Sequence, residues 1–114
     1  MVIEGEVVLD EPGSLAGATL RVTLQDVSMA DAAAHTLAVS DRMVRGRAVQ
    51  RLPFRLELPR PPRAGRRYAL AAEIRAQGHA RVEAGDFLNT VAVPWVPDER
   101  RRTGWTIPVR RIRA

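Results

Sequence analysis

The sequence predicts an all-β fold, an antiparallel β-sandwich of about 7–8 short strands. Several segments alternate apolar and polar residues with a period of two, which is typical of strands that bury one face. Turn-forming residues separate these segments about every 8–12 positions, as in sandwiches and barrels. No internal repeat is visible. The 114 residues are expected to form a single domain over residues 1–114.

The first two predicted strands cover residues 2–9 and 16–25, with a turn at 10–14 between them. The second alternates most clearly, because its leucine and valine side chains all point to one face. Gly5 interrupts the first strand, and glycine inside a strand marks a bulge or a close approach of another backbone segment.

The segment after the second strand has conflicting signals. Ser28 and Asp31 have the spacing of a helix capping box before an alanine-rich run, which favours one short helical turn near residues 29–33. A period-two pattern then predicts a strand over residues 34–43. A helix that continues through Val39 stays open as the alternative.

The remaining segments complete the predicted sandwich. Five of them have strand patterns, at residues 49–58, 68–77, 79–83, 87–93 and 105–112. Pro53 cannot donate a ladder hydrogen bond, so its position is expected on an edge strand or at a bulge. Residues 94–104 are rich in proline and arginine and are predicted to be a loop before the last strand.

The residues indicate no catalytic, cofactor or metal site. The chain has no cysteine, and His35 and His79 lie in predicted strands without other ligands at metal-site spacing. We expect each histidine to be partly exposed on a sheet face. The three serines, Ser14, Ser28 and Ser40, lack the glycine context of a nucleophile elbow.

Asp26, Ser28 and Asp31 form a short polar cluster after the second strand. Such residues bond their own backbone and end regular pairing. Their spacing does not match an EF-hand loop, so the cluster is interpreted as a stabilised turn rather than a calcium site.

The formal net charge is +5, and all 18 basic residues are arginine. The absence of lysine is interpreted mainly as coding bias, although arginine also suits phosphate and carboxylate partners. A nucleic-acid or anionic-surface site would use the basic residues Arg100, Arg101, Arg102, Arg110, Arg111 and Arg113. Trp95 and Trp105 flank the first three, and we expect them to be packing anchors beside a solvated loop rather than a stacking platform.

The order of several segments resembles the YbaY-type, or YscW-like, lipoprotein domain, which includes pilotins of type III secretion. The resemblance is carried by residues 20–32 (LRVTLQDVSMADA), 52–58 (LPFRLEL) and 68–74 (YALAAEI), followed by Gly78 and Arg81-Val82. The Asp-Val-Ser-x-Ala-Asp-Ala string at 26–32 is the specific part. The family-like core covers about residues 5–93, and residues 94–114 add a loop and a last strand.

The resemblance implies a compact β-sandwich without enzymatic activity. In pilotins it implies a chaperone-like role toward a secretin subunit during outer-membrane assembly, in the periplasm or at the outer membrane. The sequence has no signal-peptide pattern, no lipobox cysteine and no apolar run long enough to span a bilayer, so a cytoplasmic location also stays open.

Three functional hypotheses follow. The first is a non-enzymatic envelope-type module that binds a protein or peptide in a groove or by strand addition, with the Pro53 strand or the strand 105–112 as candidate edge. The second is a domain that binds nucleic acid or an anionic membrane surface. The third, a small hydrolase on a transthyretin-like sandwich, would need a pocket in which histidine and arginine converge.

Overall fold

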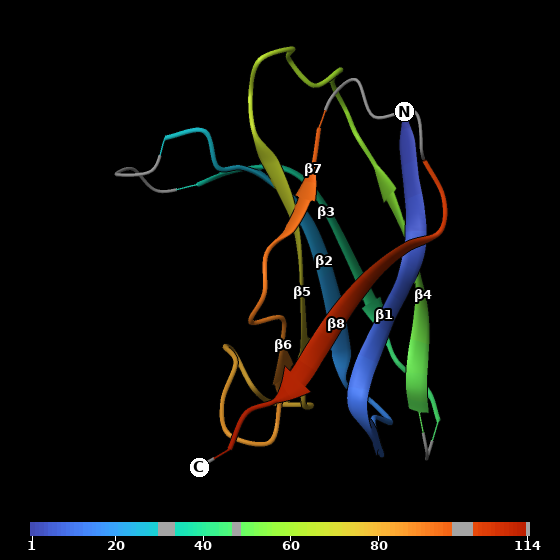
Figure 1. Ribbon diagram of the computed structural model, residues 1–114. Coiled ribbons are helices and arrows are strands. Elements are labelled where there is room, and N and C mark those ends of the chain that lie inside the picture. Colours follow the sequence, from blue (N-terminus) through green and yellow to red (C-terminus); the bar gives the residue numbers. More distant parts are fainter. Residues whose placement is uncertain (30–33, 47–48, 97–101, 114) are drawn as a thin grey trace.

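The computed structural model describes residues 1–29, 34–46, 49–96 and 102–113, and these form a mixed, strongly curved β-sheet (Figure 1). Its strands are β1 (Val2–Gly13), β2 (Thr19–Asp26), β3 (His35–Met43), β4 (Val49–Glu57), β5 (Tyr68–Arg75), β6 (Phe87–Leu88), β7 (Val93–Trp95) and β8 (Trp105–Arg111). No helix occurs among the described residues, so none there is long and apolar enough to cross a bilayer.

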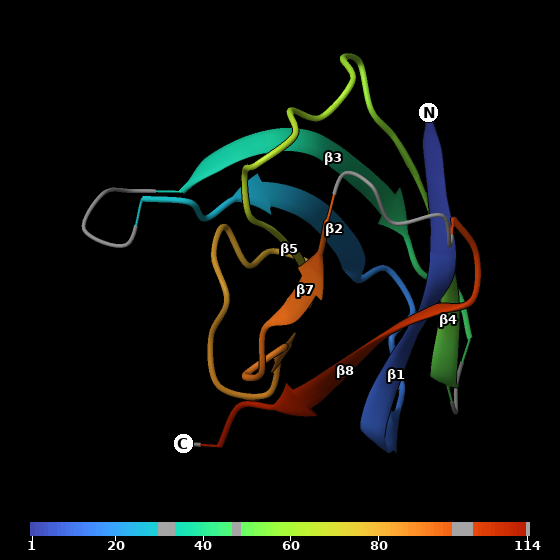
Figure 2. The same ribbon diagram turned by 45° about the horizontal axis from the view of Figure 1, so that its top comes forward.

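The strand order is β3-β2-β5-β6-β8-β1-β4, and β7 pairs with β5 beside β6. The sheet curls until its two end strands, β3 and β4, approach each other, and it is nearly closed into a barrel (Figure 2). The prediction of an all-β fold is confirmed, but a plain antiparallel sandwich is wrong. β8 runs parallel to β1, since both strands start at the same end of the molecule (Figure 1).

The core lies inside this curled sheet and is built from the apolar face of each long strand. In β5 the side chains alternate between buried and partly buried along the whole strand, as the sequence pattern predicts. The largest fully buried side chains include Trp95, Phe87, Ile3, Leu9, Leu20, Leu24, Leu56, Leu70, Ile74 and Ile107. The curl lets residues from both ends of the chain share one interior.

Gly5 lies where the parallel pair β1–β8 begins, opposite Trp105. A Cβ atom at this position would collide with the carbonyl oxygen of Trp105 and would lie 2.9 Å from Cε1 of Phe54. The predicted close approach of another backbone segment at Gly5 is therefore confirmed.

Some local predictions need correction. Residues 79–83 form an irregular loop between turns at 77–78 and 84–85 instead of a strand, and the predicted strand 87–93 is replaced by the two short strands β6 and β7. Pro94 and Trp95 belong to β7 rather than to a loop, because this segment finds backbone partners on β5. Much of the turn expected at residues 10–14 is instead the end of β1.

The contested segment after β2 is partly settled. β3 confirms the strand predicted over residues 34–43, so a helix through Val39 is wrong. The helical turn predicted near residues 29–33 falls mostly on residues 30–33, which lie outside the described residues.

Candidate functional site

A seam separates the two end strands of the sheet. β3 and β4 are consecutive in the chain, approach each other near their connection and diverge away from it (Figure 1). No β3–β4 pairing occurs among the described residues. The seam holds a cleft of about 260 Å³ near the connection and one of about 580 Å³ farther along.

The wider cleft has apolar side chains on both banks. Its lining residues are Met1, Thr36, Leu37, Ala38, Val39, Glu57, Leu58 and Pro59. Leu58 and Ala38 belong to the core, whereas Val39 and Met1 are exposed. The cleft therefore connects the surface with the edge of the hydrophobic interior.

The structure tests the two strand edges that the sequence suggested. β4 with Pro53 is an end strand, so the edge position of this proline is confirmed. The terminal strand β8 lies between β6 and β1 in the strand order, but β6 pairs only with its last two residues, Arg110 and Arg111, so the predicted edge is confirmed for only part of β8. The other side of β8 pairs in parallel with β1, which the antiparallel prediction did not include.

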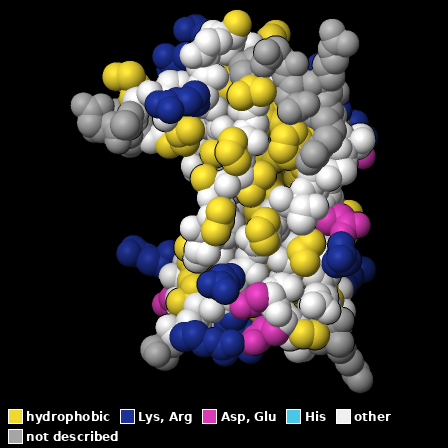
Figure 3. Space-filling view, viewed as in Figure 1, with side chains coloured by type: hydrophobic (Ala, Val, Ile, Leu, Met, Phe, Trp, Pro, Cys, Tyr) yellow, Lys and Arg dark blue, Asp and Glu magenta, His cyan; other side chains and the backbone are white. Residues whose placement is uncertain are grey.

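A second apolar surface covers the outer side of β5 and β7. Val27, Ala69, Ala92, Pro94 and Val96 contribute to the lining of a shallow hollow of about 330 Å³. The space-filling view shows further hydrophobic side chains in the middle of the molecule, in the region between β7 and β8 (Figure 3). This surface is available for contact with another apolar surface.

The two histidines lie far apart in the fold. His35 begins β3 at the end of the sheet where Asp26 pairs with Tyr68, whereas His79 follows the opposite end of β5. His35 lies in β3 with an exposed side chain, as predicted. His79 is partly exposed but lies in the loop between β5 and β6, so its predicted place in a strand is wrong. The convergent histidine pocket that a hydrolase would need is not formed by these residues.

Asp86 gathers the polar groups around His79. Its carboxylate is buried and accepts hydrogen bonds from the backbone N–H groups of Ala76 at 2.9 Å and Glu83 at 3.0 Å. Nδ1 of the His79 ring lies 2.7 Å from the Asp86 carboxylate, and Nε2 lies 3.1 Å from the Glu83 carboxylate. Because carboxylates occupy both imidazole nitrogens, neither is directed at a substrate, and the cluster is a structural support for the β5–β6 loop.

Burial and pairing set the protonation of this cluster. The hydrogen bond with Asp86 raises the pKa of His79, and the negative charges of Asp86 and Glu83 add to this rise against the cost of partial burial. Burial raises the pKa of Asp86, but its hydrogen bonds with His79, Ala76 and Glu83 outweigh this, so the pKa is lowered. Asp86 was not predicted as a site residue, and its one signal in the sequence is its place in a glycine-containing turn.

The polar turn after β2 is confirmed at its described residues. Asp26 accepts the backbone N–H of Ser28 at 2.9 Å and binds Arg66 at 2.8 Å, while Ser28 accepts the N–H of Arg67 at 2.7 Å. These bonds, with the Ser28 contribution largest, lower the pKa of Asp26 to about 2. Asp31, the third residue of the predicted cluster, lies outside the described residues.

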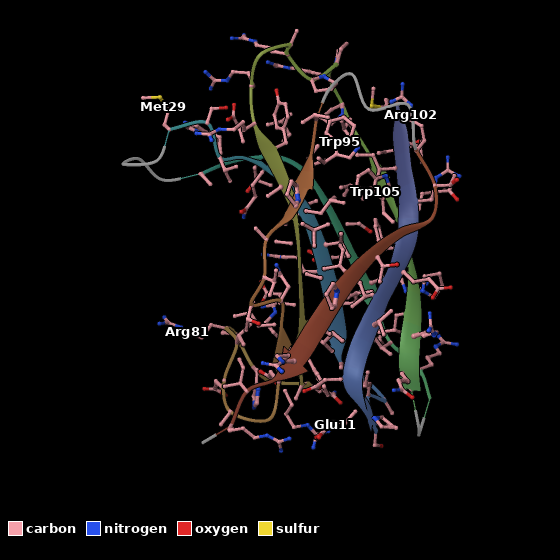
Figure 4. All side chains as sticks on the ribbon, in the orientation of Figure 1. Glu11, Met29, Arg81, Trp95, Arg102 and Trp105 are labelled. Atoms are coloured by element: carbon pink, nitrogen blue, oxygen red, sulfur yellow. The ribbon has the colours of Figure 1, made fainter. Side chains whose placement is uncertain are left out.

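The arginines of the hypothetical anionic-ligand site are not gathered on one surface. Arg100 and Arg101 lie outside the described residues. Arg111 and Arg113 pair with Glu11 at 3.0 and 2.9 Å, and Arg111 also lies over the ring of Phe87. Figure 4 shows Arg102 and Glu11 at opposite ends of the molecule. Arg110 lies in β8, directly before Arg111.

Trp95 and Trp105 are buried, which confirms their expected role as packing anchors. Trp95 contacts Tyr68 in an edge-to-face geometry with ring centroids 6.0 Å apart. Buried rings cannot stack on nucleic-acid bases, so these two residues provide no platform for a single strand. No metal-binding group of three or more histidine or acidic residues occurs within the part of the chain that the structure describes.

Comparisons with known proteins agree with the resemblance seen in the sequence. The family described as "Type III secretion system lipoprotein chaperone (YscW)" matches residues 1–93. A solved structure described as an alternative pilotin from the type II secretion system of Vibrio cholerae is similar over 100% of this chain and 98% of its own, with a TM-score of 0.80 and 26% sequence identity. Comparison with curated protein sequences gave no significant match.

The family match covers most of the chain and includes the segments that carried the resemblance. The family is one of non-enzymatic chaperones, which agrees with the structural role of the histidine cluster. The chain belongs to the YscW family of type III secretion system lipoprotein chaperones.

Proposed function

We propose that this protein is a pilotin that binds a segment of a secretin subunit and keeps it competent for assembly in the outer membrane. The observation that carries the proposal is the similarity to a type II secretion pilotin along the whole chain, at a TM-score of 0.80. The family match to secretion chaperones supports the same function.

The geometry suits the capture of an extended polypeptide. A sheet with unpaired edges can add a partner strand through main-chain hydrogen bonds, and neighbouring apolar pockets then select its side chains. The seam between β3 and β4 combines two strand edges with a cleft of about 580 Å³.

The site of action under this proposal is the periplasmic side of the outer membrane. A lipoprotein chaperone of a secretin must meet its client there, after both proteins are exported. Separation of inner and outer membranes from the native bacterium, followed by detection of the protein in each fraction, tests this location. Recovery in the cytoplasm would contradict it.

Binding can be tested with the isotope-labelled protein and synthetic peptides from the C-terminal region of the secretin encoded in the same genome. We expect saturable NMR shift changes that a scrambled peptide of the same composition does not cause. The absence of any shift at millimolar peptide would remove the pilotin proposal.

The cellular role is tested by deleting the gene and following the secretin. Fewer heat-stable secretin multimers are expected in the outer membrane, with recovery after complementation. Unchanged amounts and location of secretin multimers in the deletion strain would contradict the proposed role.

A further inference from the structure

Among the described residues, four strands have an edge without a neighbouring strand, and proline occurs in three of these strands but not in β3. Besides the end strands β3 and β4, the outer side of β7 and much of the side of β8 away from β1 are unpaired. β4, β7 and β8 each contain a proline, at Pro53, Pro94 and Pro108, and β3 contains none. A proline on a free edge removes a donor and protects the edge from pairing.

The hydrogen bonds around β1 show where two of these prolines point. Leu58 donates to the carbonyl of Met1 at 2.9 Å, so the N–H and C=O groups of the even-numbered residues in β4 face β1. Those of the odd-numbered residues face the other way, and the nitrogen of Pro53 therefore faces the seam. Glu4 donates toward β8, to the carbonyl of Arg102 at 2.8 Å. The backbone N–H and C=O groups of even-numbered residues in β1 therefore face β8. Because Pro108 lies directly opposite Val8 in the parallel pair, Val8 bonds the residues on either side of Pro108, and the nitrogen of Pro108 faces away from β1.

The same parity argument applies to β7. The carbonyl of Ala72 accepts from Asn89 at 3.2 Å, so the even-numbered groups of β5 face this side of the sheet. The backbone groups of Tyr68 and Leu70 bond those of Trp95 and Val93. The nitrogen of Pro94, which lies between these two residues, therefore faces away from β5. All three prolines therefore interrupt the free edge of their strand.

The free edge of β3 is not interrupted in this way. Val44 donates to the carbonyl of Ala18 at 2.8 Å, which directs the even-numbered groups at the end of β3 toward β2. The N–H and C=O groups of Val39, Asp41 and Met43 consequently face the seam. Val39 and Met43 also have side chains that are 51% and 67% exposed.

The surroundings of this edge indicate the chemistry of its partner. The wide part of the seam offers apolar walls at Leu37, Val39 and Leu58. Arg42 lines the narrow part, and Arg60 directly follows Pro59 at the wide part. Neither arginine has a carboxylate within ion-pair distance among the described residues. A segment that alternates apolar side chains and carries acidic residues near its ends would complement both features.

We propose that β3 is the docking edge of this protein, where an extended segment of the partner with apolar and acidic side chains adds as a strand and lies in the β3–β4 cleft. This inference rests on the proposed pilotin function and names the surface that performs it. The proline-bearing edges of β4, β7 and β8 are protected from the same pairing, so the partner is directed to one edge.

Amide hydrogen exchange in the unmodified protein tests the edge. The probe is the secretin-derived peptide with the highest affinity from the titration described above. We expect at least about tenfold slower exchange at Val39 and Asp41 after saturation, because these amides gain hydrogen bonds. The amides of Arg51 and Arg55 on the β4 bank serve as internal controls and should change much less.

The outcomes separate this inference from the function on which it rests. Saturable binding with protection confined to another edge, or without protection at Val39 and Asp41, would overturn the β3 assignment and leave the pilotin function intact. No binding by any peptide would refute the pilotin function itself and the β3 assignment with it.

A pair of proline variants gives a second test. Val39→Pro removes a seam-facing donor from β3, whereas Arg55→Pro removes one from β4, and circular dichroism checks that both fold. We expect about tenfold weaker peptide binding for Val39→Pro and little change for Arg55→Pro. The reverse ranking would assign the site to β4, and the exchange experiment decides the question if Val39→Pro does not fold.

Discussion

Nδ1 of His79 lies 2.7 Å from a carboxylate oxygen of Asp86, and this pair joins the end of β5 to the end of β8. The side chain of Asp86 is only 2% exposed, and its backbone carbonyl accepts the N–H of Ile112 at 2.8 Å. A single aspartate thus connects the loop after β5 with the C-terminal strand.

Replacing Asp86 with asparagine should lower the free energy of unfolding by about 1–3 kcal/mol. The amide cannot accept from Ala76, Glu83 and His79 in the way that two carboxylate oxygens do, and a buried donor left without a partner is costly. Urea denaturation measures the change. Glu83→Gln is the control and should have a smaller effect because Glu83 is exposed.

The His79–Asp86 pair should make stability decrease as pH rises above 6.5. Asp86 holds the pKa of folded His79 above its ordinary value of 6.5, so the protonated imidazole stabilises the fold below that pH. The contribution is lost as pH rises through the folded pKa. Urea midpoints on both sides of pH 6.5 should show this decrease in the native protein and not in His79→Gln. Parallel curves for the two proteins would contradict it.

Asp26 should control stability on the acid side. Its pKa is about 2 in the folded protein against an ordinary value of 3.8, so its contribution is present above pH 3.8 and is lost as pH falls toward 2. The melting temperature of Asp26→Asn should therefore fall less between neutral and acidic pH than that of the native protein. An unchanged decline would mean that Asp26 is not the group responsible.

Gly5→Ala should destabilise the protein by about 1–3 kcal/mol or more, because the new methyl group collides with the Trp105 carbonyl where β1 and β8 meet. Chemical denaturation measures the loss. Glu6→Ala in the same strand removes an exposed side chain and is expected to change stability by about 0.5 kcal/mol at most. Equal effects of the two variants would show that the close approach does not limit residue 5.

Pro53→Thr should promote self-association, because it restores a donor to the free edge of β4 and produces a longer uninterrupted edge. Sedimentation velocity over a range of protein concentrations should reveal a larger dimer fraction for Pro53→Thr than for the native protein. Pro61→Thr, in the loop before β5, is the matched control and should behave like the native protein. A monomeric Pro53→Thr at all concentrations would argue against a protective role for this proline.

The sequence was most informative where one face of a strand is buried and the other is exposed to solvent. β2 and β5 could be placed because their apolar residues alternate, and alternation reports burial on one face directly. Residues 79–83 show the limit of this signal: a short alternation can also occur in a turn, and here His79 and Glu83 bind each other and Asp86 instead of a neighbouring strand. β6 and β7 were misjudged because strands of a few residues depend on their partners more than on their own pattern.

By itself the sequence determined the long strands and their buried faces, the placement of Pro53 on an edge or at a bulge, and the resemblance to secretion chaperones, since these depend on local periodicity and on residue identities. Only the tertiary structure decided that β8 runs parallel to β1, that β3 and β4 meet at an open seam, and that Asp86 gathers the groups around His79. Each of these relationships joins residues through the curl of the sheet, and no local pattern records which backbone groups are left without a neighbour when the curl stops short of closure.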